Sequence, residues 1–182
     1  MILHGDVLDK LQEIESDSVQ CVVTSPPYWG LRNYQTEGQL GLEKTPEEYV
    51  EKMVKVFREV KRVLKKDGTC FLNLGDSYSQ TGDLGIGGSE KQRSNKGANL
   101  VKRNRSKGLN PKNLVGIPWR VAFALQSDGW WLRQDIIWHK PNPMPESVQD
   151  RCTKSHEYIF LLTKSAKYYY DNDAIREPVS DV

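Results

Sequence analysis

The spacing of apolar residues along the chain predicts strands and helices in alternation. Val19 to Val23 is a nearly continuous apolar run, which is expected of a strand buried on both faces of a parallel sheet. Thr45 is a suitable N-cap, and Pro46 starts a helix whose apolar residues recur at helical spacing before Asp67-Gly68 stops it. Thr69 to Leu74 is the next strand. A strand, a helix and a second strand form a crossover unit, which implies a parallel pair and the α/β class.

Four further patterns complete the predicted order of elements. They are a helix over Val7–Ile14, a helix over Leu114–Gln126, a strand over Trp130–His139, and a strand over Glu157–Thr163 with an antiparallel return over Ala166–Tyr170. The stretch at about 77–112 is poor in apolar residues and rich in Gly, Ser, Asn and cations, so it is predicted to be a long functional or disordered loop. Residues 1–182 are interpreted as a single domain portion that carries this loop.

The first strand runs directly into Ser25-Pro26-Pro27-Tyr28. Two consecutive prolines cannot continue a central strand, so the chain leaves the sheet there, at the carboxyl end of the strand. In open α/β sheets, ligands bind at that end. The position of these four residues therefore predicts a ligand site. The alternative is a structural turn whose tyrosine only packs against its neighbours.

A strand that ends in Ser-Pro-Pro-Tyr resembles the catalytic loop of the DNA amino-methyltransferases, which methylate cytosine N4 or adenine N6. The other segments that look like this family are His4-Gly5-Asp6, Leu40-Gly41-Leu42-Glu43, Asp67-Gly68-Thr69, Asn73-Leu74-Gly75-Asp76, Ile137 to Pro145, His156-Glu157-Tyr158 and Tyr168-Tyr169-Tyr170. A catalytic loop near the amino terminus is similar to the β class. The resemblance implies a Rossmann-like methyltransferase fold, S-adenosylmethionine as the methyl donor, and double-stranded DNA with one base flipped out.

The chemistry that the resemblance implies explains these residue types. An exocyclic amine is a poor nucleophile until acceptors at its two N–H bonds favour a more pyramidal nitrogen. The Ser25 hydroxyl and the Pro26 carbonyl can be those acceptors, and the ring of Pro27 helps to hold the carbonyl rigidly outward. Tyr28 offers a face on which an extruded base can stack, worth roughly 1–3 kcal/mol. Serine at the first position is commoner among N4-cytosine enzymes, and adenine N6 stays the alternative.

Three residues are assigned to the methyl donor through the same resemblance. Asp6 matches an acidic position beside the donor's adenine, Thr24 ends the catalytic strand, and Asp76 follows the next strand at the same edge. A helix-capping role is an equal alternative for Asp6 and Asp76. The glycine turn that holds the amino-acid end of the donor, usually Phe-x-Gly-x-Gly in this family, does not occur in the sequence.

The missing turn predicts an incomplete fold without the glycine-loop half. Such a sheet would expose a strand edge and apolar faces that a second polypeptide, self-association or a longer native chain would cover. The chain alone is therefore expected not to methylate DNA. A non-catalytic nucleic-acid-binding remnant and a subunit of a split enzyme are the alternatives to a catalytic portion.

The positive charge is concentrated in one acid-free block. Its seven cations are Lys91, Arg93, Lys96, Lys102, Arg103, Arg105 and Lys107. Since the net charge is +2, the rest of the chain carries −5, and the block is predicted to contact DNA phosphates. A solvated loop is the alternative. The resemblance adds Lys140 and Asn142 as contacts near the target base.

Composition excludes other classes. No apolar run approaches the roughly 20 residues that a membrane span needs, and the first residues lack the basic start and apolar stretch of a signal peptide, so a cytoplasmic location is expected. The scattered positions of three histidines and of Cys21, Cys70 and Cys152 argue against a metal site or a disulfide framework. None of these cysteines follows a proline, which disfavours cytosine-C5 methylation.

Overall fold

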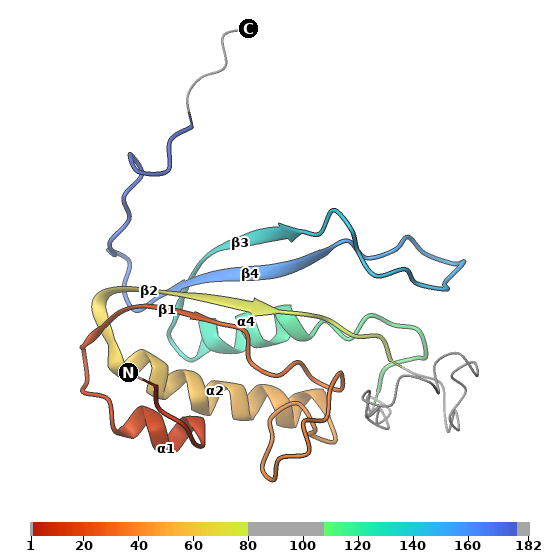
Figure 1. Cartoon of the computed structure of the whole chain (residues 1–182), viewed down its shortest axis with the longest axis horizontal. Coiled ribbons are helices and arrows are strands. Elements are labelled where there is room, and N and C mark those ends of the chain that lie inside the picture. The colour runs from red at the N-terminus through yellow and green to blue at the C-terminus, as the bar shows by residue number, and fades with distance from the viewer. Residues whose placement is uncertain (1, 80–107, 178–182) are drawn as a thin grey trace, which may run out of the picture.

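The computed structural model describes residues 2–79 and 108–177, which form a four-stranded mixed sheet with helices packed on it (Figure 1). The strands are β1 (Val19–Thr24), β2 (Leu64–Leu74), β3 (Trp131–His139) and β4 (His156–Thr163), in the order β1-β2-β4-β3. β1 and β2 are parallel, whereas β4 is antiparallel to both β2 and β3. The predicted parallel pair is thus confirmed.

The two longer helices, α2 (Pro46–Val63) and α4 (Ile117–Ser127), lie on the same side of the sheet, and α1 (Val7–Gln12) packs against α2 (Figure 1). The start of α2 follows the predicted capping, because Thr45 Oγ1 accepts a hydrogen bond from the Glu48 amide at 3.2 Å and Pro46 occupies the first turn. Within residues 2–79 and 108–177, no helix is long and apolar enough to cross a bilayer.

The core lies between the helices and one face of the sheet. Leu72 on β2 pairs with Phe160 on β4, and both side chains are fully buried against the helices. Val121 and Leu125 of α4 are equally buried. Each such aliphatic side chain contributes roughly 1.5–3 kcal/mol through burial, so this layer holds the helices against the sheet.

The predicted end of the second helix is wrong. α2 ends at Val63, and β2 begins at the next residue, Leu64, which is fully buried and pairs with Val19. Gly68 therefore lies inside β2, where an added Cβ would come within 2.7 Å of Leu64 Cγ and 2.9 Å of the Gln20 carbonyl oxygen. Tertiary pairing with β1 overrides the helical spacing at this point.

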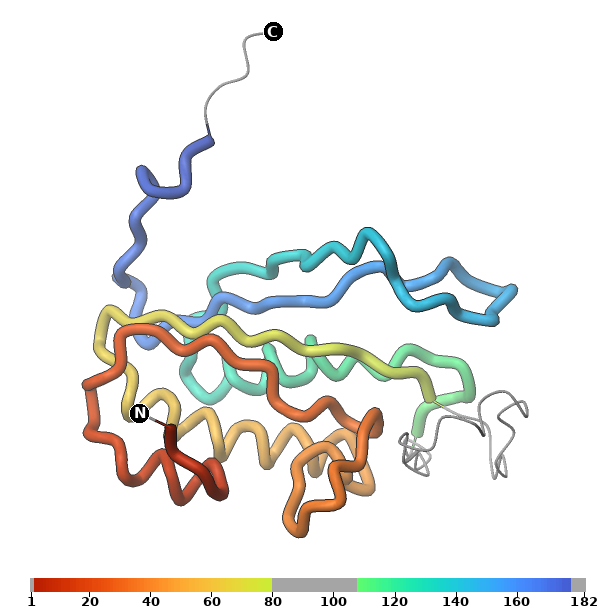
Figure 2. The backbone as a smooth tube through the Cα atoms, in the orientation of Figure 1, coloured from red at the N-terminus to blue at the C-terminus, as the bar shows by residue number. Residues whose placement is uncertain are grey.

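The predicted antiparallel return over Ala166–Tyr170 is also wrong. β4 already has β2 on one edge and β3 on the other, so no edge is free for a hairpin partner. The chain instead leaves the sheet after β4, as the backbone tube in Figure 2 shows, and the Tyr169 amide donates to the Asp67 carbonyl oxygen at 2.9 Å. The remaining elements begin or end within a few residues of their predicted bounds.

β1 is not buried on both faces, as its apolar run predicted. It is the edge strand of the described sheet, Cys21 is exposed, and the Val23 side chain is 78% exposed. Val23 pairs with Phe71, so both point to the face opposite α2 and α4. This exposure agrees with the expected uncovered edge and apolar face.

Candidate active site

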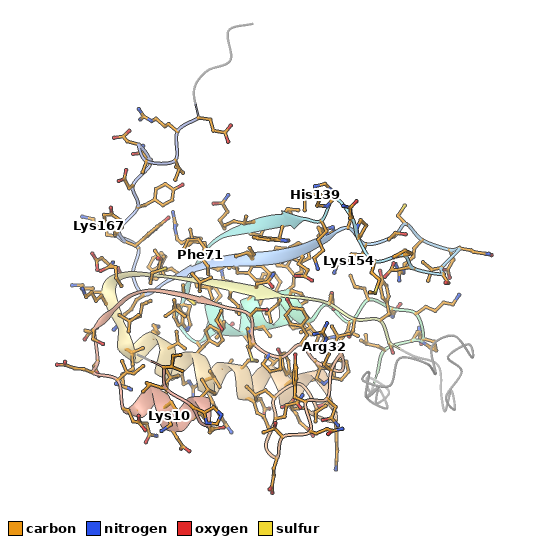
Figure 3. The ribbon with its side chains drawn as sticks, in the orientation of Figure 1. Lys10, Arg32, Phe71, His139, Lys154 and Lys167 are labelled. Atoms are coloured by element: carbon orange, nitrogen blue, oxygen red, sulfur yellow. The ribbon has the colours of Figure 1, made fainter. Side chains whose placement is uncertain are left out.

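The carboxyl ends of β1, β2 and β3 meet the amino end of β4 at one end of the sheet (Figure 1). Figure 3 labels two residues there, His139 at the end of β3 and Lys154 in the loop before β4. The residues that converge on this end come from four segments, namely Ser25 to Tyr28, Asn73 to Asp76, Lys140, and Glu157. The ligand edge predicted from one motif is therefore assembled from distant parts of the chain.

The loop after β1 is held from below by α2. The Tyr49 hydroxyl donates a hydrogen bond to the Pro27 carbonyl oxygen at 3.0 Å, and Tyr49 is fully buried, which raises the pKa of its phenol. In the described part of the chain, no donor engages the neighbouring Pro26 carbonyl. Pro26 thus keeps a free acceptor next to the Ser25 hydroxyl, and the Ser25 side chain is itself exposed.

The Ser25 and Tyr28 hydroxyls converge on one amide at the end of β2. Asn73 Oδ1 lies 3.2 Å from Ser25 Oγ and 2.5 Å from Tyr28 Oη, and the two hydroxyl oxygens are 3.2 Å apart. Asn73 Nδ2 donates to the Tyr158 carbonyl oxygen at 3.1 Å. Because only the amide nitrogen can donate to that carbonyl, the amide oxygen faces the two hydroxyls.

Glu157 lies beside the same cluster and is paired with a lysine. Its Oε2 is 3.3 Å from Tyr28 Oη, and its Oε1 forms an ion pair with Lys140 Nζ. Partial burial acts to raise the pKa of Glu157, but the hydrogen bond and charge of Lys140, with help from Asn73 and Tyr28, hold it below its ordinary value. Glu157 is therefore a carboxylate at neutral pH.

The Tyr28 ring packs against Gly75, at a position that leaves no room for a side chain. A Cβ added to Gly75 would lie 2.6 Å from Cε2 of the Tyr28 ring, closer than such atoms approach. Burial, together with the nearby Glu157, raises the pKa of Tyr28, although its hydrogen bond with Ser25 acts the other way. The ring is thus fixed at the strand ends with its hydroxyl protonated at neutral pH.

The residues assigned to the methyl donor have capping contacts in this structure. Asp6 caps α1, since its Oδ1 accepts from the Leu8 amide at 2.9 Å. Asp76 Oδ1 accepts from the Gly116 and Ile117 amides, each at 3.0 Å, at the start of α4. Its second oxygen, Oδ2, is buried and has no hydrogen-bond donor among the residues that the structure describes. Thr24 ends β1 and pairs with Leu72.

The residues assigned to DNA are only partly described. The seven cations between Lys91 and Lys107 lie outside the described residues. Asn142 is exposed in the loop between β3 and β4, whereas Lys140 is engaged with Glu157. Among the residues that the structure describes, no cluster of three or more His, Cys, Asp or Glu side chains could hold a metal ion.

Two residues of the cluster were not predicted from the sequence. Asn73 could have been found, because it ends the strand next to β1 and carboxyl ends of parallel strands share one edge. Glu157 lies in the family-like segment His156-Glu157-Tyr158, but its approach to Tyr28 depends on the antiparallel insertion of β4 between β2 and β3. Together, the residues of this cluster can accept hydrogen bonds from N–H groups, and the Tyr28 ring can stack against a planar ring.

Comparison with known sequences places the chain among DNA methylases. The family model described as DNA methylase (N6_N4_Mtase) matches residues 19–182. The type II methyltransferase M.SmaI of Serratia marcescens is 54% identical over 181 residues, which cover 99% of this chain and 61% of that protein. M.Cfr9I of Citrobacter freundii is 52% identical over 97% of this chain and 58% of its own length. The chain thus spans about three fifths of these curated relatives.

Solved structures show the same fold. The PvuII DNA methyltransferase (cytosine-N4-specific) superposes with a TM-score of 0.61 at 18% identity, over 94% of this chain and 51% of that one. A putative DNA modification methylase from Thermus thermophilus, complexed with S-adenosyl-L-methionine, gives 0.59 at 22% identity over 93% and 55%. The fold is therefore the Rossmann-like methyltransferase fold, of which this chain forms about half. On the match to most of its length, the chain belongs to the N6/N4 DNA methylase family.

Proposed function

We propose that this chain is the catalytic portion of a DNA amino-methyltransferase that methylates the exocyclic amine of a flipped base in duplex DNA. The observation that carries the proposal is the pairing of an exposed Ser25 hydroxyl with the unengaged Pro26 carbonyl, beside the fixed ring of Tyr28. Two acceptors and a stacking face are what an amine nucleophile on a planar base requires. Such an enzyme would meet its DNA in the cytoplasm.

The favoured target is cytosine N4. Serine at the first position of the motif supports it, because a neutral hydroxyl at Ser25 is the form commoner among the N4-cytosine enzymes. The name of the PvuII neighbour is consistent with that choice, although the two chains are only 18% identical. Adenine N6 is the alternative, since both bases present an amine next to a ring nitrogen acceptor.

In the proposed mechanism, each residue has one task. The base stacks on the Tyr28 ring, one amine N–H donates to Ser25 Oγ, and the other donates to the Pro26 carbonyl oxygen. These bonds favour a pyramidal nitrogen and take up positive charge as it develops on the amine. S-adenosylmethionine, when bound, would supply the methyl group from its sulfonium by direct displacement, with S-adenosylhomocysteine as the leaving group and the extra amine proton passing to solvent. No side chain of the chain becomes covalently attached to the base.

The donor set fits this cofactor in part. Among the described residues, no donor reaches the buried Asp76 Oδ2, and Thr24 is the last residue of β1, whereas Asp6 caps α1. These three residues would hold the nucleoside end. No Phe-x-Gly-x-Gly occurs in residues 1–182, so the amino-acid end of the donor requires a segment that these residues do not contain.

We infer that another polypeptide segment covers β1. Its edge and the side chain of Val23, 78% exposed, give an apolar surface that isolated sheets do not leave open. A longer chain, a partner subunit or a second copy could provide the cover. A second copy would still lack the glycine turn, so self-association would leave the chain inactive.

The residues proposed to contact DNA are the seven cations between Lys91 and Lys107, together with Asn142.

A fusion protein tests the proposal. Residues 1–182 would be joined to the part of M.SmaI that the match does not cover, which the high identity makes feasible. Purified fusion and purified 182-residue chain are each incubated with duplex DNA and radiolabelled S-adenosylmethionine. The fusion should incorporate label and the chain alone should not. If the fusion binds DNA and the donor without transfer, a non-catalytic nucleic-acid-binding remnant is the better description.

A further inference from the structure

Lys140 is held against the protein surface by an ion pair instead of projecting as a free cation. Its ammonium pairs with Glu157 Oε1, and the two side chains are 41% and 22% exposed. The backbone supports this contact, because the Lys140 amide donates to the Ser155 carbonyl oxygen at 2.7 Å and thereby closes the loop between β3 and β4. Lys140 thus comes from one end of that loop and Glu157 from the other.

We propose that Glu157, with Lys140, is a positioning residue of the base site that fixes the Tyr28 hydroxyl and thereby directs the Ser25 proton away from the substrate amine. The proposal rests on the proposed function, since it assigns the orientation of the groups that would receive the base. It also narrows the expected role of Lys140 near the target base, because Lys140 would act through Glu157 and would not contact the DNA itself.

The direction of the hydrogen bonds follows from counting donors. A carboxylate can only accept, and Asn73 presents its oxygen to the hydroxyls because one N–H of its amide nitrogen is donated to the Tyr158 carbonyl. The single Tyr28 proton is assigned to Asn73 Oδ1 or to Glu157 Oε2, because neither oxygen can donate, whereas Ser25 Oγ carries its own proton and can donate to Tyr28 Oη. In either case a lone pair of Tyr28 Oη faces Ser25.

The Ser25 hydroxyl then has only acceptors on its inner side. Its proton can be donated to Tyr28 Oη or to Asn73 Oδ1, each at 3.2 Å. The lone pairs of Ser25 Oγ remain directed at the exposed side, where an amine N–H can donate to them. Without the acceptors on Asn73 and Glu157, the Ser25 hydroxyl could turn its proton outward. The hydroxyl proton would then face an N–H of the substrate amine, and neither group could accept a hydrogen bond from the other.

Lys140 keeps Glu157 in the form that this arrangement needs. A protonated Glu157 would carry a donor, and that donor could turn the Tyr28 hydroxyl around. The Lys140 ammonium lowers the pKa of Glu157 against the effect of burial. It also occupies Oε1, so that Oε2 is the oxygen left for Tyr28.

The competing role for Lys140 is a contact with a DNA phosphate, and the two roles predict different measurements. A phosphate contact contributes about 0.9 to the slope of log affinity against log salt, so its removal reduces that slope. A positioning residue leaves the slope unchanged and acts on turnover. Lys164 offers a matched control, because it is also a partly buried lysine paired with an acid, Asp17, but lies at the opposite end of β4.

The test compares Glu157→Gln, Lys140→Met and Lys164→Met in the M.SmaI fusion. The first two variants should lower kcat on the order of 10- to 100-fold, as small misplacements of catalytic groups do, with the salt slope of DNA binding unchanged. Lys164→Met should leave kcat and the slope as they are. A slope reduced by about 0.9 with kcat retained in Lys140→Met, or full turnover in Glu157→Gln, would overturn the proposal.

A second readout needs no turnover. In the 182-residue chain labelled with ¹³C-tyrosine, Glu157→Gln should lower the pKa of Tyr28, and Lys164→Met should not, with Tyr28→Phe identifying the resonance. An unshifted Tyr28 titration in Glu157→Gln would contradict the proposal. If the parent fusion transfers no methyl groups, the proposed function fails, while this titration still decides whether Glu157 acts on Tyr28.

Discussion

The Tyr28 hydroxyl lies 2.5 Å from Asn73 Oδ1, although 45 residues separate the two along the chain. Tyr28 follows β1 and Asn73 lies at the end of β2, and these strands are parallel neighbours. The contact therefore exists because a crossover helix returns the chain to the same edge of the sheet. It joins the residue that would stack the base to the strand that fixes it.

Replacing Asn73 tests this junction. Asn73→Ala removes the acceptor of two hydroxyls and leaves the Tyr158 carbonyl without its donor, so the free energy of unfolding should fall by about 1–3 kcal/mol. Turnover of the M.SmaI fusion should fall on the order of tenfold or more, with DNA affinity retained. Urea unfolding and single-turnover kinetics measure the two effects. Unchanged turnover per folded molecule would show that the Ser25 and Tyr28 hydroxyls need no fixed acceptor.

Gly75 should be intolerant of a side chain only while Tyr28 is present. In Gly75→Ala the new methyl would overlap the Tyr28 ring, so the ring must move, at a cost of roughly 1–3 kcal/mol in stability and a loss of turnover. In a Tyr28→Ala background the same substitution should cost little stability. Equal destabilisation in both backgrounds, measured by urea unfolding, would mean that the conflict lies elsewhere.

Glu157 should contribute to stability in a pH-dependent way. Its pKa is lower in the folded state than in the unfolded chain, so its contribution is present above the ordinary pKa of a glutamate and is lost as pH falls through the folded value. The groups around it are Lys140 and Tyr28, with Lys154 nearby. The difference in unfolding free energy between the parent and Glu157→Gln should therefore shrink from about pH 6 to about pH 3. A difference that stays constant on acidification would show that the ion pair of Glu157 with Lys140 does not stabilise the folded protein.

The sequence predicts the strands and helices that are local in origin and misses those that depend on pairing. Thr45 and Pro46 predict the start of α2 through capping chemistry that needs no other element. Leu64 cannot be assigned to β2 from helical spacing, because its pairing with Val19 decides its conformation. The return over Ala166–Tyr170 fails for the same reason, since β4 is already paired on both edges.

In the candidate site, too, some residues can be predicted from local sequence and others depend on how the strands pair. Ser25 and Tyr28 are predictable, because the prolines between them force the chain out of the sheet at a ligand edge. Glu157 is not, because only the insertion of β4 beside β2 brings it near Tyr28. The pairing of Lys140 with Glu157 could not be predicted either, because it joins the chain after β3 to the start of β4.

Cysteine labelling should report whether a further segment covers the open face of β1. Cys21 and Cys152 are exposed, whereas burial, with a smaller effect of Cys21, raises the pKa of Cys70 to about 12, so its thiol should be unreactive. In the 182-residue chain, a maleimide should label Cys21 and Cys152 and leave Cys70 unlabelled. In the M.SmaI fusion, Cys21 should become protected while Cys152 does not. Equal labelling of Cys21 in both proteins would contradict the proposed cover on β1.

The basic block should supply much of the affinity for DNA. Replacing Lys102, Arg103 and Arg105 with alanine in the fusion should flatten the dependence of log affinity on log salt, by up to about 0.9 for each phosphate that is no longer neutralised. Fluorescence anisotropy with a labelled duplex at several salt concentrations measures the slope. An unchanged slope would assign the phosphate contacts to other residues.

Product analysis of the fusion tests most directly whether the loop after β1 methylates a base amine. DNA treated with the M.SmaI fusion and S-adenosylmethionine is digested to nucleosides, and the methylated nucleoside is identified by mass, beside the Ser25→Ala fusion as the matched variant. We expect N4-methylcytosine from the parent fusion, and a loss of about two or more orders of magnitude in Ser25→Ala, as when one preorganised hydrogen-bonding group at a reacting centre is removed. Full activity in Ser25→Ala, or no methylated base from a fusion that binds both DNA and donor, would contradict the account.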